Sequence, residues 1–207
     1  MKSGNSIIEA IKARRSIRQF RKEPVSDELV NQILESGLWA PSGKNNQPWK
    51  FAVIRDSALK GSLASLTHYS STIKNAPVCI AVFLDHSRVY DRTKDVQAIG
   101  ASIQNMLLTI HSMGLGGVWL GEILKNKGKV GELLGVGDEF ELMAVIALGY
   151  PTGKSLRSER DSSRQQETTA FGRGGMRHRL TGMSPHRGAR QGPRAWPVGL
   201  HWKRRFS

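Results

Sequence analysis

Three arginines and a serine lie within five residues near the start of the chain. Arg14, Arg15, Ser16 and Arg18 occupy this stretch. Guanidinium groups bind phosphate through paired, charge-assisted hydrogen bonds, and a nearby hydroxyl adds a further donor. The cluster therefore indicates a phosphate site. A solvated basic patch is the alternative, because short arginine clusters are common on protein surfaces.

A second group of polar residues lies in the stretch 40–48, where two prolines and a glycine predict a loop. Asn45, Asn46 and Gln47 place neutral amides on this loop, and each amide is both a donor and an acceptor. Such groups suit the edge of a heterocycle or a polyol better than a metal ion. A plain surface turn is the alternative, and the adjacent Trp49 is expected in the core.

The third candidate is the glycine-rich stretch 114–121. Three glycines precede Trp119, and Gly121 follows Leu120. Without side chains, these positions let a flat ligand lie against the backbone. The alternative is a tight turn from a helix into a strand.

Residue types that would indicate other chemistry are missing or scattered. His68, His86 and His111 show no metal-ligand spacing, and no serine elbow or Cys–His pair is evident. Cys79 lies in an apolar run and is expected to be a small buried residue. Three aspartates are expected to be solvated turn residues: Asp85, Asp91 and Asp95. If the chain is an enzyme, its chemistry is therefore that of a cofactor.

The charge of the chain is unevenly distributed. The 207 residues carry a net charge of +14, but residues 1–153 hold 18 basic and 14 acidic side chains. Residues 154–207 hold 13 basic and 3 acidic ones, with eleven arginines and seven glycines. This basic tail has too little apolar surface to offset its ordering entropy, so we expect it to be largely disordered. Residues 1–153 are expected to form the folded domain.

Hydrophobic periodicity predicts the elements that would position the three candidate stretches. Helices are expected over residues 6–14, 27–34, 58–66, 95–113 and 129–134, with Ser26 and Asp95 as caps and Gly114 as a stop. Strands are expected over residues 49–54, 78–84, 117–120 and 142–148. The result is an α/β domain with about four strands. No apolar run approaches a membrane span, and no secretory signal precedes the first helix, so we expect a cytoplasmic protein.

Five stretches in this order resemble the FMN-dependent nitroreductase family: residues 14–20, 40–49, 100–107, 114–121 and 147–151. The resemblance covers about residues 5–153. It implies an α+β fold with a central mixed β-sheet of four to five strands flanked by helices. It further implies a homodimer with FMN at the subunit interface.

The resemblance also implies roles for individual residues. Arg14, Arg15 and Ser16 would hold the FMN phosphate, and Arg18 would lie beside flavin N1 and the C2 carbonyl. Pro41, Ser42 and Gly43 would pack against the ring from the other subunit. Asn45 would bond the pyrimidine edge or the ribityl chain. The backbone at Leu120 and Gly121 would offer an N–H near flavin N5.

The activity implied is electron transfer from NADH or NADPH through flavin N5 to nitroaromatics, quinones or similar small acceptors, in a ping-pong cycle without a catalytic side chain. Two alternatives remain at this point. One is other flavin chemistry on the same fold, such as reductive dehalogenation or flavin-linked oxidation. The other is non-enzymatic nucleic-acid binding through the basic tail, although no specific nucleic-acid or membrane partner is expected.

The tail departs from the family pattern. Family members continue with a basic residue for the FMN phosphate and an ordered segment that reaches across the partner subunit. Lys154, Arg157 and Arg160 could supply the phosphate contact. Beyond them the apolar pattern is lost, and we interpret the stretch as a shifted-frame or otherwise altered terminus.

Overall fold

The computed structural model describes residues 6–153, 167–171 and 177–181. The chain divides into two units, Met1–Ser158 and Glu159–Ser207, and each is described by itself. Within the described residues, no helix is long and apolar enough to cross a membrane.

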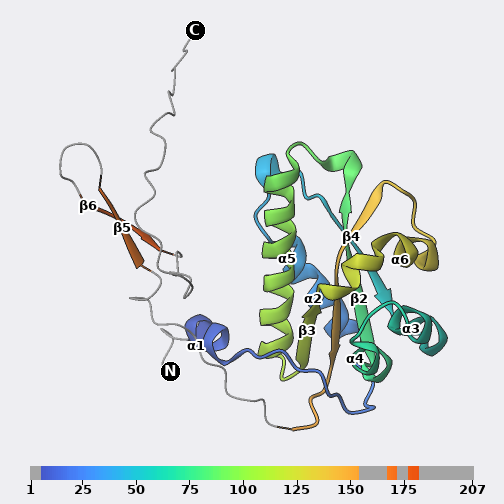
Figure 1. Cartoon of the computed structure of the whole chain (residues 1–207). Coiled ribbons are helices and arrows are strands. Elements are labelled where there is room, and N and C mark those ends of the chain that lie inside the picture. Colours follow the sequence, from blue (N-terminus) through green and yellow to red (C-terminus); the bar gives the residue numbers. More distant parts are fainter. Residues whose placement is uncertain (1–5, 154–166, 172–176, 182–207) are drawn as a thin grey trace, which may run out of the picture. The chain divides into compact units, whose positions relative to one another are not determined.

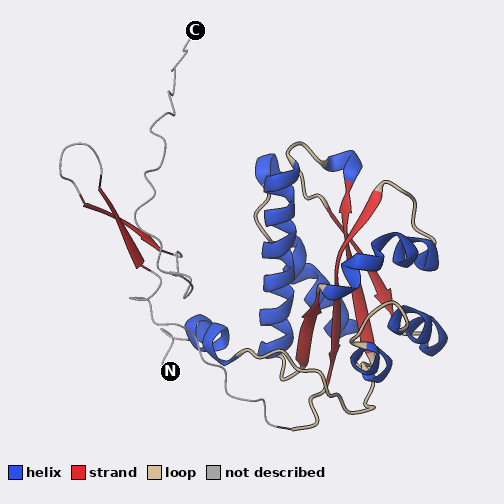
Figure 2. Ribbon diagram, viewed as in Figure 1, coloured by secondary structure: helices blue, strands red, loops and turns tan. Residues whose placement is uncertain are grey.

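The first unit alternates helices and strands (Figures 1 and 2). Its elements, in chain order, are α1 (Ser6–Ala13), α2 (Asp27–Leu38), β1 (Trp49–Ile54), α3 (Ser57–Ala64), α4 (Ser70–Asn75), β2 (Val78–Asp85), α5 (Arg92–Ser112), β3 (Gly116–Leu120), α6 (Lys127–Leu134) and β4 (Phe140–Gly149). Short 3-10 turns lie at η1 (Gly43–Asn45), η2 (His86–Arg88) and η3 (Glu122–Asn126). Every helix and strand predicted for residues 6–148 is present.

The four strands form one sheet in the order β1-β2-β4-β3. This confirms the α+β fold, but the sheet differs from the expected mixed one because all three neighbouring pairs are antiparallel. The reason is the place of β4. The single helix α5 connects β2 to β3, which therefore run parallel to each other, but β4 inserts between them.

The sheet contributes side chains to two hydrophobic cores, one on each face. All eight residues of β2 are buried, and alternate side chains point to opposite faces. Ile80 and Val82 pack with the core under α2 and α5, whereas Ala81 and Phe83 pack with the core under α3, α4 and α6. Figure 1 shows this layered arrangement, with helices covering both faces of the sheet.

Helix ends follow local side-chain chemistry. Ser26 caps α2, since its hydroxyl accepts a hydrogen bond from the Leu29 N–H at 3.3 Å. Gly114, with φ of +74°, follows the C-terminus of α5 as predicted. The predicted cap of α5 was wrong: Asp91 caps it by accepting from the Lys94 N–H at 3.0 Å, and Asp95 lies inside the first turn. The six-residue helix α4 was not predicted, because a segment of fewer than two helical turns shows no repeating apolar pattern.

In the second unit, β5 (Glu167–Phe171) and β6 (Arg177–Thr181) form an antiparallel pair. The sequence shows no strand pattern there, so these two strands differ from the prediction of a largely disordered tail. The alternation that marks a half-buried strand is absent from both segments. The rest of the predicted disordered tail lies outside the described residues, as do Lys154, Arg157 and Arg160.

Candidate active site

Residues 14–18, the N-terminal strap, lie along the edge strand β3. The Ile17 N–H donates to the Gly117 carbonyl at 3.1 Å, and Ser16 forms a parallel bridge with Gly117. Gly116 permits this approach, because a Cβ there would come within 2.7 Å of Ile17 Cβ. The first and third candidate stretches are therefore in direct contact.

Two of the three arginines of the strap border a pocket of about 230 Å³ at the C-terminal end of α5. Its lining includes Arg14, Arg15, His111, Gly114 and Gly117. The Arg15 guanidinium donates through Nη1 to the Lys12 carbonyl at 2.6 Å and to the Arg14 carbonyl at 2.8 Å. Two guanidinium groups beside the exposed backbone of Gly114 are suited to binding an anionic phosphate.

Arg18 lies apart from the other two arginines and is exposed. Its Nη1 donates to the Ser16 carbonyl at 3.4 Å, and its guanidinium carbon lies 5.8 Å from the centre of the Tyr69 ring. A cation over an aromatic face is attracted by the ring quadrupole. Tyr69, which sequence analysis did not single out, therefore restricts the position of this charge.

The loop between α2 and β1 is held in an unfavourable backbone conformation. Lys44, Asn45 and Gln47 all have positive φ angles, of 54°, 54° and 47°. Such angles are uncommon for residues with a Cβ, and clusters of them are found at functional sites. The Ser42 hydroxyl accepts a hydrogen bond from the Gln47 N–H at 3.1 Å and closes the loop.

Asp95 anchors this loop from inside the protein. Its carboxylate is fully buried and accepts from Asn46 Nδ2 at 2.7 Å and from the N–H groups of Tyr90 and Asp91 at 3.1 Å each. The prediction of a solvated turn residue was therefore wrong for Asp95, and also for the buried Asp85. Asp95 lies one helical turn before Ile99, on the stripe that Ile103 and Met106 continue, so the helical period was a signal of its burial.

The Pro41, Ser42 and Gly43 side of the loop borders a second pocket, of about 330 Å³, against the N-terminal half of α5. The Tyr90 ring forms one wall, with Lys44 Nζ at 5.0 Å and Lys94 Nζ at 5.2 Å from its centre. A Cβ on Gly43 would overlap the Tyr90 hydroxyl, so a larger residue at this position would require the Tyr90 ring to move.

The two pockets do not meet within one chain. The loop pocket contacts α5 at Gln97, Ala98 and Ala101, whereas the arginine pocket contacts it at Leu107 and His111. At a rise of 1.5 Å per residue, Gln97 and His111 lie about 20 Å apart along the helix. The structure thus brings the strap together with β3 and keeps the 41–43 loop at the other end of α5.

The turn after β3 contains Leu120, which is buried, and Gly121, which is exposed. Gly121 precedes η3, and its carbonyl accepts from the Leu124 N–H at 3.1 Å. The next residue, Glu122, accepts from Thr67 Oγ1 at 2.6 Å and from the His68 N–H at 3.0 Å. Hydrogen bonds from Lys125 and then Thr67 lower the pKa of Glu122 to about 2.

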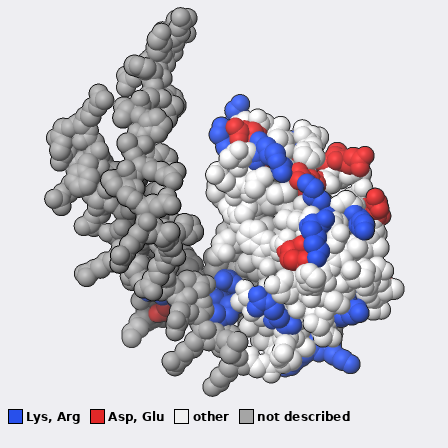
Figure 3. Space-filling view, viewed as in Figure 1, with Lys and Arg blue, Asp and Glu red and all other residues white. Residues whose placement is uncertain are grey.

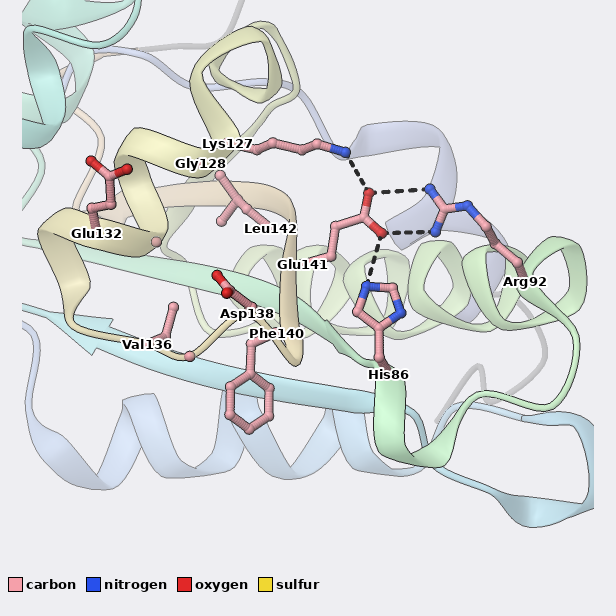
Figure 4. Close-up of a pocket in the computed structure, with 12 residues that line it drawn as sticks. His86, Arg92, Lys127, Gly128, Glu132, Val136, Asp138, Phe140, Glu141 and Leu142 are labelled. Atoms are coloured by element: carbon pink, nitrogen blue, oxygen red, sulfur yellow. Dashed lines mark hydrogen bonds and ion pairs between the residues drawn. The ribbon is translucent and has the colours of Figure 1, made fainter.

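A further pocket, of about 500 Å³, lies beside the start of α6 and contains none of the predicted site residues. Figure 4 shows Glu141 at its edge, facing Arg92, Lys127 and His86. Arg92 Nη1 lies 2.8 Å, Lys127 Nζ 2.7 Å and His86 Nε2 3.4 Å from the carboxylate. Arg92 and Lys127 are therefore both paired with Glu141, whereas the carboxylates of Glu132 and Asp138 also line the pocket.

The described residues do not support catalysis by a cysteine nucleophile or by a metal ion. Cys79 is buried, and burial raises the pKa of its thiol to about 12, so the thiolate nucleophile is not available. Residues 6–153 contain no cluster of three side chains that could hold a metal ion. On the face shown in Figure 3, basic and acidic side chains adjoin in the upper part of the described domain, and basic side chains predominate toward its lower edge.

A model of the nitroreductase family matches residues 11–69 and 60–150. The chain belongs to the nitroreductase family. A protein of Methanothermobacter thermautotrophicus, named as an NADH dehydrogenase/NAD(P)H nitroreductase, is 35% identical over 147 residues, which are 70% of this chain and 77% of the relative. Membership makes the chain an NAD(P)H-dependent flavin oxidoreductase of the nitroreductase type and confirms the prediction of FMN as cofactor.

Solved structures of this family share the fold. A nitroreductase structure from Desulfovibrio desulfuricans, in complex with FMN, is 44% identical, with a TM-score of 0.75 over 78% of this chain and 95% of that one. The NADPH:FMN oxidoreductase from Vibrio harveyi, complexed with NAD+, is 28% identical, with a TM-score of 0.72 over 77% of this chain and 74% of that one. In both cases the similarity covers most of this chain.

Proposed function

We propose that the chain forms a homodimer that transfers electrons from NADH or NADPH through interfacial FMN to nitroaromatics, quinones or similar small acceptors. One observation carries the proposal. The strap with its β3 turn and the 41–43 loop, which would face the same flavin, lie at opposite ends of α5 within one chain. A second copy of the chain would bring the two groups of residues together.

The donors at the arginine pocket fit the FMN phosphate. Arg14, Arg15 and Ser16 supply two guanidinium groups and a hydroxyl beside the backbone of β3. Bidentate contacts from arginine add orientation as well as affinity. These residues therefore anchor the cofactor, with Lys154, Arg157 or Arg160 as further candidates for the phosphate.

Bound FMN supplies hydride transfer at N5, and the residues of this chain set its environment. Arg18 stabilises negative charge at the pyrimidine end of the reduced ring, which favours reduction. The backbone at Leu120 and Gly121 donates near N5, and Asn45 bonds the pyrimidine edge or ribityl chain. Pro41, Ser42 and Gly43 of the second copy exclude water from one face of the ring.

The surface of α1 supports the homodimer. Ile7, Ile8 and Ile11 are 72%, 52% and 50% exposed. Three large apolar side chains on one short helix are poorly placed in water, whereas homodimer interfaces are rich in such residues. A second copy would cover them.

We further propose that the two half-reactions use the same cleft, so that NAD(P)H leaves before the acceptor enters. The test is steady-state kinetics over a range of both substrates, with the expectation of parallel double-reciprocal lines. Intersecting lines would exclude the ping-pong order. Purified protein should also be yellow and should bleach on anaerobic addition of NADH or NADPH.

The cofactor site is tested by FMN titration of Arg15→Ala, with Lys50→Ala on the exposed part of β1 as the matched control. We expect the first variant to bind FMN at least about tenfold more weakly, since a charge-assisted hydrogen bond contributes about 1.5–3 kcal/mol. The control should bind normally. Sedimentation of the wild type should give twice the chain mass, and a monomer that still binds FMN tightly would contradict the interfacial site.

The extent of the domain and the nature of the tail are proposals as well. We propose that residues 1–153 form the FMN-binding domain, that the part of the basic tail beyond about Arg160 is an altered terminus without a function of its own, and that the protein is cytoplasmic. Sequencing the encoding DNA tests the altered terminus, and an intact family-like ending in the same frame would contradict it. Retention of nucleic acid by a chain truncated after Gly153 would exclude the tail as a binding element.

A further inference from the structure

The turn η3 is attached to the segment between α3 and α4 by three hydrogen bonds. Glu122 Oε2 accepts from Thr67 Oγ1 at 2.6 Å and from the His68 N–H at 3.0 Å. Asn126 Nδ2 donates to the Leu66 carbonyl at 2.8 Å. One carboxylate therefore takes two of the three bonds, and both come from consecutive residues of the other segment.

This second segment, residues 67–69, leads directly to Arg18. Thr67 is buried, and its hydroxyl oxygen accepts from the Tyr69 N–H at 3.2 Å while its proton is donated to Glu122. The Tyr69 ring then lies 5.8 Å from the guanidinium carbon of Arg18. A continuous path of contacts thus joins Glu122 to Arg18 of the strap.

Glu122 also follows Gly121, so the path connects two groups that the proposed function assigns to the same flavin. One end is the backbone at residues 120–121, and the other is the Arg18 side chain. Lys125 pairs with the second carboxylate oxygen, Oε1. Its charge balances that of Glu122, and the two acceptor positions on Oε2 remain with Thr67 and His68.

We infer that Glu122 is a positioning residue for flavin reduction. By holding residues 67–69 against η3, it fixes the Arg18 charge relative to the turn at Leu120 and Gly121. This inference rests on the proposed function, because it takes both groups to face FMN. Glu122 itself touches neither cofactor nor substrate, and its effect passes through Tyr69 to Arg18.

The first test compares Glu122→Ala with Glu122→Gln in the full-length, FMN-loaded protein. The glutamine retains an amide oxygen that can accept from Thr67 and His68, whereas the alanine removes every bond. We expect Glu122→Ala to lower the rate of flavin reduction by NADPH by about tenfold or more, as displacements near 1 Å do. The midpoint potential of its flavin should be more negative, because the Arg18 charge is no longer held in place.

Glu122→Gln should stay close to the wild type in both measurements. Lys125→Met removes the hydrogen bond and the charge that Lys125 brings to Oε1, leaves the Thr67 and His68 bonds to Oε2, and should do the same. FMN affinity should change less than about threefold in all three variants, because the phosphate contacts lie on the strap. Equal impairment of Glu122→Gln and Glu122→Ala would overturn the inference, since charge and not hydrogen bonding would then carry the effect.

A second readout does not depend on turnover. Amide hydrogen exchange at His68 and Tyr69 should accelerate in Glu122→Ala, with and without FMN, and remain slow in Glu122→Gln. Faster exchange in Glu122→Ala together with an unchanged potential and reduction rate would also overturn the inference. If Glu122→Ala does not fold, Thr67→Val removes the same contact from the other side and should shift the potential in the same direction.

Failure of the inference is distinguishable from failure of the proposed function. If the wild-type protein binds no FMN, or its flavin is not reduced by NADH or NADPH, the proposed function fails. If the wild type is reduced and Glu122→Ala behaves identically, only the positioning role fails.

Discussion

Glu122 and Glu141 are both ion-paired glutamates, yet they hold different kinds of partner. Glu141 receives side-chain cations from the helices α5 and α6 and lies near His86 of the turn after β2. Glu122 receives a hydroxyl and a backbone N–H from consecutive residues. Long cationic side chains tie elements together but tolerate shifts of several tenths of an ångström. Bonds to backbone and to a short hydroxyl fix one segment in one place.

Asp95 extends the comparison. It is fully buried, takes two backbone N–H groups and one amide, and holds a loop with three left-handed residues. The candidate flavin residues are thus supported by carboxylates that bind backbone, whereas Glu141, in the pocket beside α6, is bound by cationic side chains. The partners of a carboxylate, more than its charge, therefore distinguish a positioning role from a purely stabilising one.

The largest effect is expected from Asp95→Ala. The variant removes the acceptor of the part-buried Tyr90 and Asp91 N–H groups and one of the two acceptors of Asn46 Nδ2, which also donates to the Arg88 carbonyl at 2.9 Å. The free energy of unfolding should therefore fall by about 3 kcal/mol. FMN affinity should fall as well, because the loop of residues 42–47 loses its anchor. Urea denaturation and FMN titration measure the two effects. Asp95→Asn keeps one acceptor oxygen, so it should lose less stability and less FMN affinity. A folded Asp95→Ala variant with normal FMN affinity would show that the loop of residues 42–47 does not contribute to FMN binding.

Gly116→Ala tests the contact between the strap and β3. The new methyl group would meet Ile17 Cβ at 2.7 Å and push the strap away from the strand. We expect a loss of about 2 kcal/mol in stability from overpacking and a weaker FMN complex. Thermal unfolding and fluorescence titration of FMN measure the outcome. Unchanged FMN affinity would mean that the strap does not carry the phosphate.

Glu141→Gln should affect stability without affecting the flavin. Burial raises the pKa of Glu141, but hydrogen bonds from Lys127 and Arg92 and their charges outweigh it, so the pKa lies below the ordinary glutamate value. The carboxylate therefore stabilises the fold above the ordinary pKa, and this contribution is lost as the pH falls through the lower folded value. Unfolding near neutral pH should show a loss of about 1 kcal/mol in the variant.

The control for that result is the pH dependence itself. The stability difference between wild type and Glu141→Gln should shrink as the pH falls below the ordinary pKa of glutamate. A difference that stays constant down to strongly acidic pH would show that packing, and not the ionised carboxylate, is responsible. FMN affinity and reduction rate should be unchanged throughout.

The smallest effect is expected from Gly131→Ala in the middle of α6. An added Cβ would lie in ordinary contact with Val136 Cγ2 at 3.6 Å. The substitution should stabilise the protein by about 0.5–1 kcal/mol, because glycine loses more backbone entropy on helix formation. Chemical denaturation measures this gain. A loss of FMN affinity in this variant would contradict the expectation that α6 does not influence the candidate FMN site.

Much of the fold could be predicted because its signals are local. The apolar run of β2, the helical spacing of Ile99, Ile103 and Met106, and the stop at Gly114 each depend on a few neighbouring residues. Strand order could not be predicted in the same way. The insertion of β4 between β2 and β3 depends on contacts between distant parts of the chain, so periodicity indicated the strands but not their directions.

The candidate site shows the same contrast between local sequence signals and contacts between distant parts of the chain. Arginine, glycine and amide clusters drew attention to the strap, the loop and the turn at residues 120–121. Asp95, Tyr69 and Glu122 were missed or misjudged because their roles depend on partners 49, 51 and 55 residues away in the chain. A carboxylate that binds a distant backbone N–H leaves no spacing pattern, and only the three-dimensional structure reveals it.

The separation of the two pockets along α5 has a genetic consequence. In the proposed homodimer, each site combines the strap of one chain with the 41–43 loop of the other. Two inactive variants, one altered in the strap and one in the loop, would therefore complement each other when mixed. Every mixed dimer has one site that carries both defects and one that carries neither, so random pairing of equal amounts restores about one quarter of the wild-type sites.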